Sequence, residues 1–514
     1  MRKPRSFRKD LVRAGLASLV CASVPLGTAS GADYARTLSF EKTVAELSAM
    51  AEAGSPASDV LAAATPLGYV PDASKAPGLS WPALSETSVS LVPIDLVLSQ
   101  LALQAGANYH VALRQAQARP EVLMVEKGVA SLAMVADAAE AAGFGEVLEK
   151  TPDGYVAHLP IAVWSGASLF LRPGETLLLD REAGAFLLTS GTLLAQGAEV
   201  RGTGAVNPRL KDFKPFVVIA LSGTAMIEDA RFADLGYGLF PPLTGVTLVE
   251  GGFFRDGVPS VVRDSRFDNV KTLALMGASD AVISGNVFAG SSGPAVLFSG
   301  GKDLTASGNV VLAGPDAHGI KVTAGSRHVT VAGNFVAGAG LNGVFADAGA
   351  AELTVVGNII AGSKRSGVSV ASADCVTVSD NLLLQNAQSG LAVSDSAGLS
   401  IAANRLYGNG NAGISVTHQP HYGRIEIASN ELDGNRVGVK GSTTAQLRFS
   451  ANNFSGQAPR LFDGELVQFT GQFYGQFFNL TGEAVIDGLR LGGGAKLTPT
   501  GALRPTSCSF EGDD

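Results

Sequence analysis

Hydrophobic and polar residues alternate with a period of two through short segments that fill most of the chain after about residue 160. Such alternation predicts half-buried β-strands, and the Gly, Asn and Asp residues between the segments predict turns. Two stretches nearer the N-terminus, residues 40–54 and 92–117, show the spacing of helices instead. A further helix is predicted at residues 129–143, where it would cap the N-terminal end of the strands.

The strand pattern is a repeat with two registers. An asparagine followed two positions later by an apolar residue recurs at intervals of 23, 25, 24, 23, 23, 26 and 22 residues. These asparagines are Asn286, Asn309, Asn334, Asn358, Asn381, Asn404, Asn430 and Asn452. A glycine followed by an aliphatic residue recurs at intervals of 24, 24, 23, 23 and 25 residues. These glycines are Gly319, Gly343, Gly367, Gly390, Gly413 and Gly438.

A repeat of this length with period-two segments is too short for TPR or WD40 units. It predicts an all-β fold, a right-handed parallel β-helix in which each coil holds about three short strands. We expect Gly and Asn to take the positive-φ positions at the corners, and the asparagines of successive coils to form a hydrogen-bonded ladder.

The chain divides into four predicted regions. A basic stretch, a short apolar run and small residues before Asp33 predict a secretory signal peptide at residues 1–32. Residues 33–120 form an N-terminal helical and linker region, residues 121–480 the β-helix, and residues 481–514 a C-terminal cap or tail. We expect an exported protein without a membrane span after signal cleavage.

Charge and cysteine content exclude some classes of partner. The predicted signal holds 6 of the 38 basic and 1 of the 46 acidic residues, so the remaining chain carries 32 and 45, a net charge of −13. A chain this acidic, with no basic stripe, is not expected to bind nucleic acid. Cys375 lies in an alternating segment and is predicted to be a buried, inert thiol; no disulfide framework, metal site or cofactor is expected.

Several segments between Pro120 and Phe478 resemble the periplasmic mannuronan C5-epimerases of bacterial alginate synthesis. The similar segments include "PEVLMVEKGVASLAMV", "LPIAVWSGASLFL", "FKPFVVIALSGTAMIEDARFADLGYG" and the "HGIKV" coil. The resemblance implies a right-handed β-helix, a periplasmic location, a polyuronate substrate such as polymannuronate or alginate, and partners in a polysaccharide secretion complex.

The sequence departs from this family at its Asp-Pro-His-Asp motif. On the coil "GPAVLFSGGKD" the motif positions are Leu297, Phe298, Ser299 and Gly300, so neither a carboxylate nor a histidine is present there. The resemblance therefore leaves two functions open. One is a C5-epimerase-like isomerase, or a related β-eliminating lyase, with a changed site. The other is a catalytically inactive homologue that binds polysaccharide or serves as a scaffold for secretion.

Candidate site residues follow from the repeat register. Counting outward positions from each glycine predicts one column of side chains, Leu297, Lys321, Phe345, Ser369, Ala392, Ser415 and Lys440. Uronate epimerisation needs a cation that offsets the C6 carboxylate, a base and an acid. We expect His318 to act as base or acid, Lys321 to neutralise the carboxylate and Asp347 to orient them. The predicted substrate contacts are Asn342, Lys364, Arg365 and Lys440.

Overall fold

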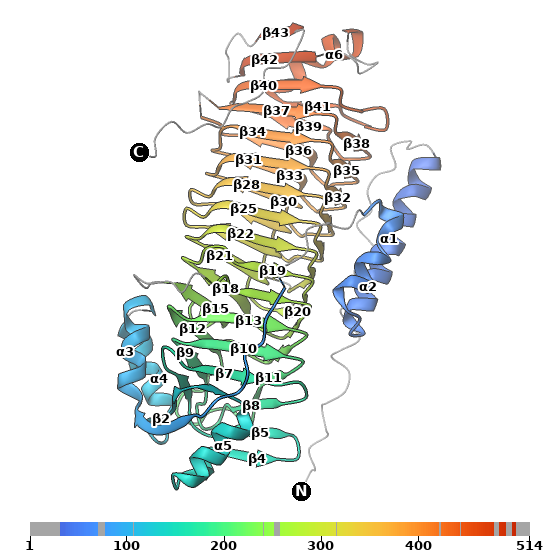
Figure 1. The fold of residues 1–514 in the computed structure, drawn as a ribbon. Coiled ribbons are helices and arrows are strands. Elements are labelled where there is room, and N and C mark those ends of the chain that lie inside the picture. Colours follow the sequence, from blue (N-terminus) through green and yellow to red (C-terminus); the bar gives the residue numbers. More distant parts are fainter. Residues whose placement is uncertain are drawn as a thin grey trace, which may run out of the picture.

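The structure is a computed structural model that describes residues 31–69, 78–105, 107–239, 241–250, 258–314, 316–420, 423–442, 444–476, 483–489 and 496–499. Strands from successive coils stack into three long sheets, A, B and C, which run the length of the molecule (Figure 1). Each regular coil passes through A, then B, then C, and pairs in parallel with the coil before and after it. The prediction of an all-β parallel β-helix with a partly helical N-terminal region is confirmed.

Sheet A consists of β1 (Ser88–Pro93), β2 (Glu121–Lys127), β6 (Ile161–Val163), β9 (Leu187–Thr189), β12 (Val217–Leu221), β15 (Gly245–Glu250), β18 (Thr272–Met276), β21 (Val296–Ser299), β24 (Ile320–Thr323), β27 (Val344–Ala346), β30 (Val368–Ala371), β33 (Ser389–Ser394), β36 (Ala412–Thr417), β39 (Val439–Gly441) and β41 (Phe462–Gly464).

Sheet B consists of β3 (Val129–Ala130), β7 (Ser168–Leu171), β10 (Thr192–Gln196), β13 (Thr224–Glu228), β16 (Val261–Arg263), β19 (Val282–Ser284), β22 (Lys302–Ser307), β25 (Arg327–Ala332), β28 (Ala351–Val356), β31 (Asp374–Ser379), β34 (Leu399–Ala402), β37 (Arg424–Ala428), β40 (Thr444–Ser450), β42 (Glu483–Leu489) and β43 (Lys496–Pro499).

Sheet C consists of β4 (Leu148–Thr151), β5 (Gly154–Ala157), β8 (Thr176–Asp180), β11 (Glu199–Thr203), β14 (Arg231–Ala233), β17 (Arg266–Asp268), β20 (Val287–Ser291), β23 (Val310–Ala313), β26 (Phe335–Ala337), β29 (Ile359–Ala361), β32 (Leu382–Leu384), β35 (Arg405–Tyr407) and β38 (Glu431–Asp433).

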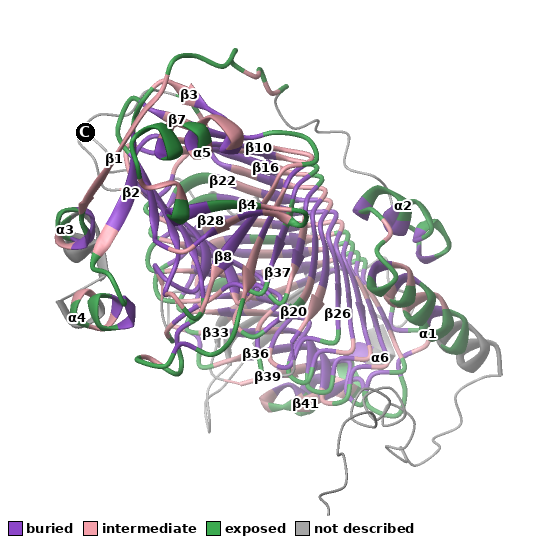
Figure 2. Cartoon of the chain, turned by 90° about the horizontal axis from the view of Figure 1, so that it is seen from below, coloured by how far each residue is buried: buried purple, intermediate pink, exposed green. Residues whose placement is uncertain are grey.

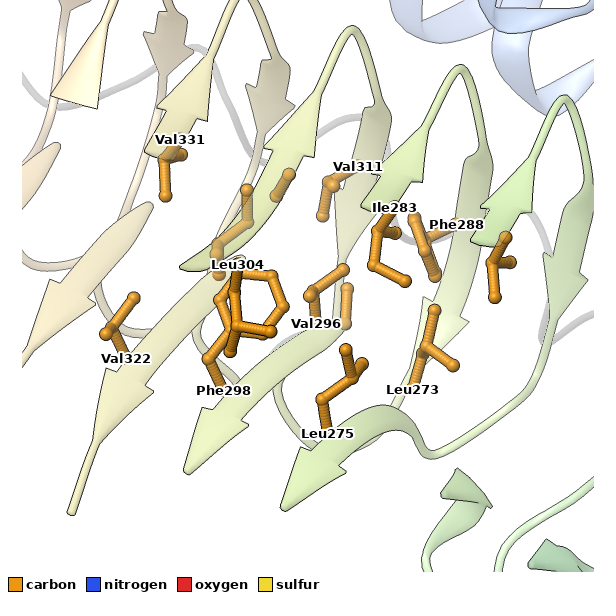
Figure 3. Close-up of a cluster of buried hydrophobic side chains, with 14 of the residues drawn as sticks. Leu273, Leu275, Ile283, Phe288, Val296, Phe298, Leu304, Val311, Val322 and Val331 are labelled. Atoms are coloured by element: carbon orange, nitrogen blue, oxygen red, sulfur yellow. The ribbon is translucent and has the colours of Figure 1, made fainter. Parts of the chain in front are cut away.

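All three sheets contribute inward side chains to one continuous core. In a single stretch of the solenoid, Leu275 and Phe298 of sheet A, Leu304 of sheet B, and Phe288 and Val311 of sheet C meet in the interior (Figure 3). Each of them is at most 1% exposed. Alternate residues of a strand point to opposite faces, so the period-two pattern places every second side chain in this core. The burial explains how a chain with 46% hydrophobic residues can keep a polar surface.

The predicted asparagine ladder forms at the turns between sheets B and C. Asn358 donates from its side chain to Asn381 Oδ1 at 2.9 Å, and its own Oδ1 accepts from the side chain of Asn334 at the same distance. The eight asparagines are at most 2% exposed. The expectation that they take positive φ is wrong. The residue before each asparagine does so instead, from Gly285 (φ 66°) to Ala451 (φ 49°).

The glycines of the second register are required by packing rather than by φ. None of them has a positive φ. A Cβ at Gly343 would lie 2.2 Å from the Ile360 side chain, and one at Gly319 would lie 2.6 Å from that of Val336. Contacts this short are not tolerated in a packed interior. A larger residue at either glycine would push its turn away from the sheet C strand against which it packs. These glycines bring each C–A turn, the turn from sheet C to sheet A, against the next coil.

Helices cover the N-terminal end and parts of two outer faces (Figures 1 and 2). The predicted cap helix is α5 (Leu132–Ala141), which packs against β1, β3, β4 and β7. α3 (Ile94–Ala105) and α4 (Ala107–Ala116) lie on the outer face of sheet A near its N-terminal strands. α1 (Gly31–Glu52) and α2 (Ala57–Ala62) lie on the outer face of sheet C, over β20 to β35. No helix in these ranges is long and apolar enough to cross a membrane.

The outer domain boundaries remain predictions. The predicted signal peptide lies outside the described residues except for its last two positions, with which α1 begins. Of the predicted C-terminal region, β42 and β43 are described; they extend sheet B in antiparallel order beyond β40.

The prediction for Cys375 is wrong. Cys375 is disulfide-bonded, and it is partly exposed at the start of β31 rather than buried. Its φ of 57° turns the chain at this position, so the side chain does not follow the inward and outward alternation of the strand. The reasoning from an alternating segment failed because the alternation begins only after this residue.

The ladder predicts a large effect for a single internal asparagine. Replacing Asn358 by Ala removes the acceptor of Asn334 and the donor to Val331 O, both at 2.9 Å. Leaving buried backbone groups unpaired costs about 1–3 kcal/mol. We expect the free energy of unfolding, measured in urea, to fall by about that amount. Asn453→Ala, at an exposed position next to the ladder, is the matched control; equal effects in the two variants would contradict the role of the ladder.

Candidate functional site

The predicted outward column of sheet A is confirmed by the strand register. Leu297 pairs with Lys321, Lys321 with Phe345, and the column continues through Ser369, Ala392, Ser415 and Lys440 to Asp463. In parallel sheets such neighbours are about 4.8 Å apart. One face therefore aligns side chains that are separated by more than twenty residues in the sequence.

The N-terminal half of this face is covered, whereas in the C-terminal half every residue of the column from Lys321 to Lys440 is partly exposed except Ser415, which is 8% exposed. Outward residues of the early strands pack with α3, α4 and the aromatic residues Phe213, Phe216 and Tyr237. Thr247 and Ala274, farther along the column, are 0% exposed, and Leu297 is 9% exposed. The side chain of Lys321, on the next coil, is 25% exposed. The polar face of sheet A thus begins at the coil that contains His318.

His318 is held in one orientation at the end of the C–A turn. Its Nδ1 accepts a hydrogen bond from the backbone N–H of Asn342 at 3.3 Å. Its ring stacks on Phe345 of the next coil, with 4.6 Å between the ring centroids and 12° between the planes. Because Nδ1 accepts, the neutral ring carries its proton on Nε2. The imidazole therefore offers an N–H donor at Nε2.

Lys321 and Asp347 form an ion pair beside this ring. Lys321 Nζ lies 3.1 Å from Asp347 Oδ2 and 5.3 Å from the centroid of Phe345. About a quarter of each of the two charged side chains is exposed. Asp347 Oδ1 is buried and has no hydrogen-bond partner within the described residues, which leaves it able to accept a proton or a hydrogen bond.

The electrostatic field at His318 is positive. Burial is the largest cause that lowers the pKa of His318, which falls to about 4. The charge of Lys321 lowers it further, Asp347 opposes this, and Arg365 lowers it again. His318 is consequently neutral at pH 7, and the two cations outweigh the one carboxylate at the imidazole.

The structure brings together some of the predicted site residues and separates others. His318, Lys321, Asp347 and Phe345 form one cluster, which we call the His318 cluster. Arg365 lies in an exposed C–A turn two coils farther on, close enough to affect the imidazole, with Lys364 beside it. Lys440 is five register steps from Lys321, about 24 Å, and pairs with Asp463 at 3.9 Å.

Asn342 occupies a supporting position. It is 5% exposed, its Oδ1 accepts from the backbone N–H of Ser366 at 3.0 Å, and its own N–H holds His318. The backbone N–H of Asn342 thus positions the imidazole, and its side-chain oxygen holds the following C–A turn. Its contact with a substrate stays a prediction.

Two features of the site were missed from the sequence. The stacking of Phe345 on His318 could have been suspected, because Phe345 is the one aromatic residue in the predicted column. A second ladder of Asn386, Asn409, Asn435 and Gln457 orders the later C–A turns. The sequence did not reveal it, because these residues recur at the same intervals as the first ladder and over fewer repeats. No group of three His, Cys, Asp or Glu side chains within the described ranges could hold a metal ion.

The geometry predicts the titration of His318. We expect its NMR-monitored pKa near 4 and its neutral ring protonated on Nε2. Since Lys321 lowers the pKa, Lys321→Met should raise it toward the usual 6.5; since Asp347 raises it, Asp347→Asn should lower it. Lys440→Met, far along the same column, is the control and should leave it unchanged. A wild-type pKa near 6.5 would contradict this geometry.

Comparisons with known proteins agree on the fold. Residues 260–459 match the sequence model of the family described as "Periplasmic copper-binding protein (NosD)", which is less than half of the chain. No curated protein matches the chain.

Among solved structures, the periplasmic alginate epimerase AlgG is 19% identical, with a TM-score of 0.53; the match covers 74% of this chain and 91% of that one. A mutant of AlgG is 18% identical over 75% of this chain and 97% of the other, with a TM-score of 0.55. The A-module of an Azotobacter vinelandii mannuronan C-5 epimerase is 16% identical over 64% and 91%, with a TM-score of 0.37. At these identities the likeness to AlgG extends to the fold, and the chain shares the parallel β-helix of that epimerase.

Proposed function

We propose that this protein is a periplasmic β-helix protein that binds an anionic polysaccharide of the polyuronate type on the open half of sheet A. The observation that carries the proposal is the positive field at the His318 cluster, in a chain whose formal net charge is −8. A carboxylate entering this site would meet Lys321, Arg365 and the Nε2–H of His318. Hydrogen bonds between such donors and a carboxylate are stronger than those between neutral groups.

The fold and its chemistry support a polysaccharide as the ligand. AlgG, which has the same fold, is described as an alginate epimerase, and alginate is an anionic polysaccharide. Phe345 adds an apolar surface next to the cations, which suits a sugar ring that has both apolar and charged faces. The small outward residues on the following coils, Ser369 and Ala392, leave an extended chain room to lie flat.

Binding can be tested by calorimetry with polymannuronate. We expect Lys321→Met and Arg365→Ala to weaken binding by about fivefold each, the upper range for a partly exposed charge pair. Added salt should weaken wild-type binding as well, because it screens exposed charges. Lys302→Met, on sheet B, is the control for net charge.

Lys321→Met leaves the half-buried Asp347 without its cation, so the double variant Lys321→Met/Asp347→Asn tests folding separately. It should unfold like the wild type and still bind weakly. Unchanged affinity in all of the cluster variants would refute the proposed site.

A C5-epimerase or lyase activity is the second candidate. It is favoured by Asp347, whose Oδ1 has no hydrogen-bond partner among the described residues. Lys321 and Arg365 would offset the C6 carboxylate and so make the C5 proton acidic. The partly exposed Asp347 carboxylate would accept this proton, and the Nε2–H of His318 would hydrogen-bond the developing enediolate. Return of a proton from water to the opposite face of C5 gives the epimer. If the C4–O bond breaks instead, the leaving oxygen takes a proton from water and a C4–C5 double bond remains, which is the lyase product.

Proton exchange at C5 distinguishes the enzyme from the binding protein. Polymannuronate is incubated with the protein in deuterated water, and deuterium at C5 is followed by NMR. Exchange that Asp347→Asn and His318→Ala each abolish would support the enzyme. Binding without any exchange would leave the noncatalytic function alone.

A further inference from the structure

We propose that a polysaccharide held at the His318 cluster extends from it in one direction only, toward the C-terminal coils, along the edge of sheet A that faces the C–A turns. The inference rests on the proposed function and deepens it, since it assigns the bound chain a direction, a path and a minimum length.

The covered half of sheet A closes the opposite direction. On the three coils directly before His318, the outward column consists of Thr247, Ala274 and Leu297, none of them more than 9% exposed. The apolar cluster beneath α3 and α4 also includes Val249 and Met276, two residues beyond Thr247 and Ala274 on the same strands. Among the residues that the structure describes there, a hydrated, charged chain finds no open polar surface on which to continue.

Unpaired cations mark the C–A edge in the open direction. Arg365, Arg436 and Arg460 are exposed in C–A turns, and their guanidinium groups make no ion pair within the described part of the chain. Backbone hydrogen bonds fix their order. Gln388 N–H donates to Arg365 O, Asn411 N–H to Gln388 O, and Gly438 N–H to Arg460 O. Arg365 and Arg460 are thus four coils apart, about 19 Å at the spacing of parallel strands.

The other edge of sheet A would repel an anionic chain. On three successive coils the A–B turns, or the strand residue directly after them, carry Asp347, Asp374 and Asp395. Between the two edges the outward residues Ser369 and Ala392 are small, uncharged and partly exposed, and Ser415 is small and 8% exposed. Cations along one border and carboxylates along the other place an anionic chain next to the C–A turns.

Length-dependent binding tests the direction. The probes are a mannuronate dimer, which reaches only the His318 cluster, and an oligomer able to cross the six coils from His318 to Arg460, about 29 Å. We expect the oligomer to bind more tightly. Arg436→Ala and Arg460→Ala should each weaken oligomer binding by about two- to fivefold, in line with exposed charge pairs, and leave dimer binding unchanged. Arg327→Ala, which removes an equal charge at the first residue of β25 in sheet B, is the matched control.

Four other results would each contradict the proposed path, and each would do so for a different reason. Equal affinity for dimer and oligomer, with binding still sensitive to Lys321→Met, would refute the path but preserve the proposed function. No binding of either probe would refute both. An equal loss in Arg327→Ala would indicate unspecific attraction. Equally tight binding of single-stranded oligothymidylate, with the same dependence on Arg436 and Arg460, would indicate a general polyanion surface.

Discussion

The parallel register between successive coils is the constraint on which the rest of the structure depends. Each strand is paired on both sides, so its inward residues must lie directly over those of the preceding coil. Asn358 and its counterparts keep the coils in step, because each side chain bonds the same group one coil farther on. Gly343 and its counterparts let the turns approach closely enough for this pairing. An error in either register would move core residues to the surface.

The same register creates the site. His318 and Lys321 belong to one coil, and Phe345 and Asp347 to the next. The stacking of these coils alone forms the ring stack of His318 with Phe345 and the ion pair of Lys321 with Asp347. Because Lys321 and Asp347 are largely shielded from water, their charges act strongly on the imidazole. The result is a neutral histidine in a positive field within an acidic protein. Such a local field attracts an anion to one coil without making the whole surface basic.

The cover on sheet A decides where this field becomes accessible. Outward residues such as Ala274 could in principle form part of a binding face, but they are buried. The coils of the solenoid repeat, but α3 and α4 cover only its early coils. The coil of His318 is therefore the first on which the outward column of sheet A is partly exposed. In the same way, α1 and α2 cover apolar residues such as Phe335 on sheet C. The N-terminal helices therefore leave only part of the outer surface of sheets A and C exposed.

The sequence by itself determined the β-helix, the first asparagine ladder and the outward column of sheet A. All three depend on a local pattern that repeats at a nearly fixed interval. Equivalent positions of successive repeats then lie side by side in adjacent coils, so the sequence also gives the strand register. It did not determine which asparagines and glycines bear positive φ, the disulfide bond of Cys375 or the supporting position of Asn342. It also could not reveal that the column is buried through Leu297 and that its partly exposed residues begin at Lys321. Those features depend on contacts between segments far apart in the chain, which only the tertiary structure brings together.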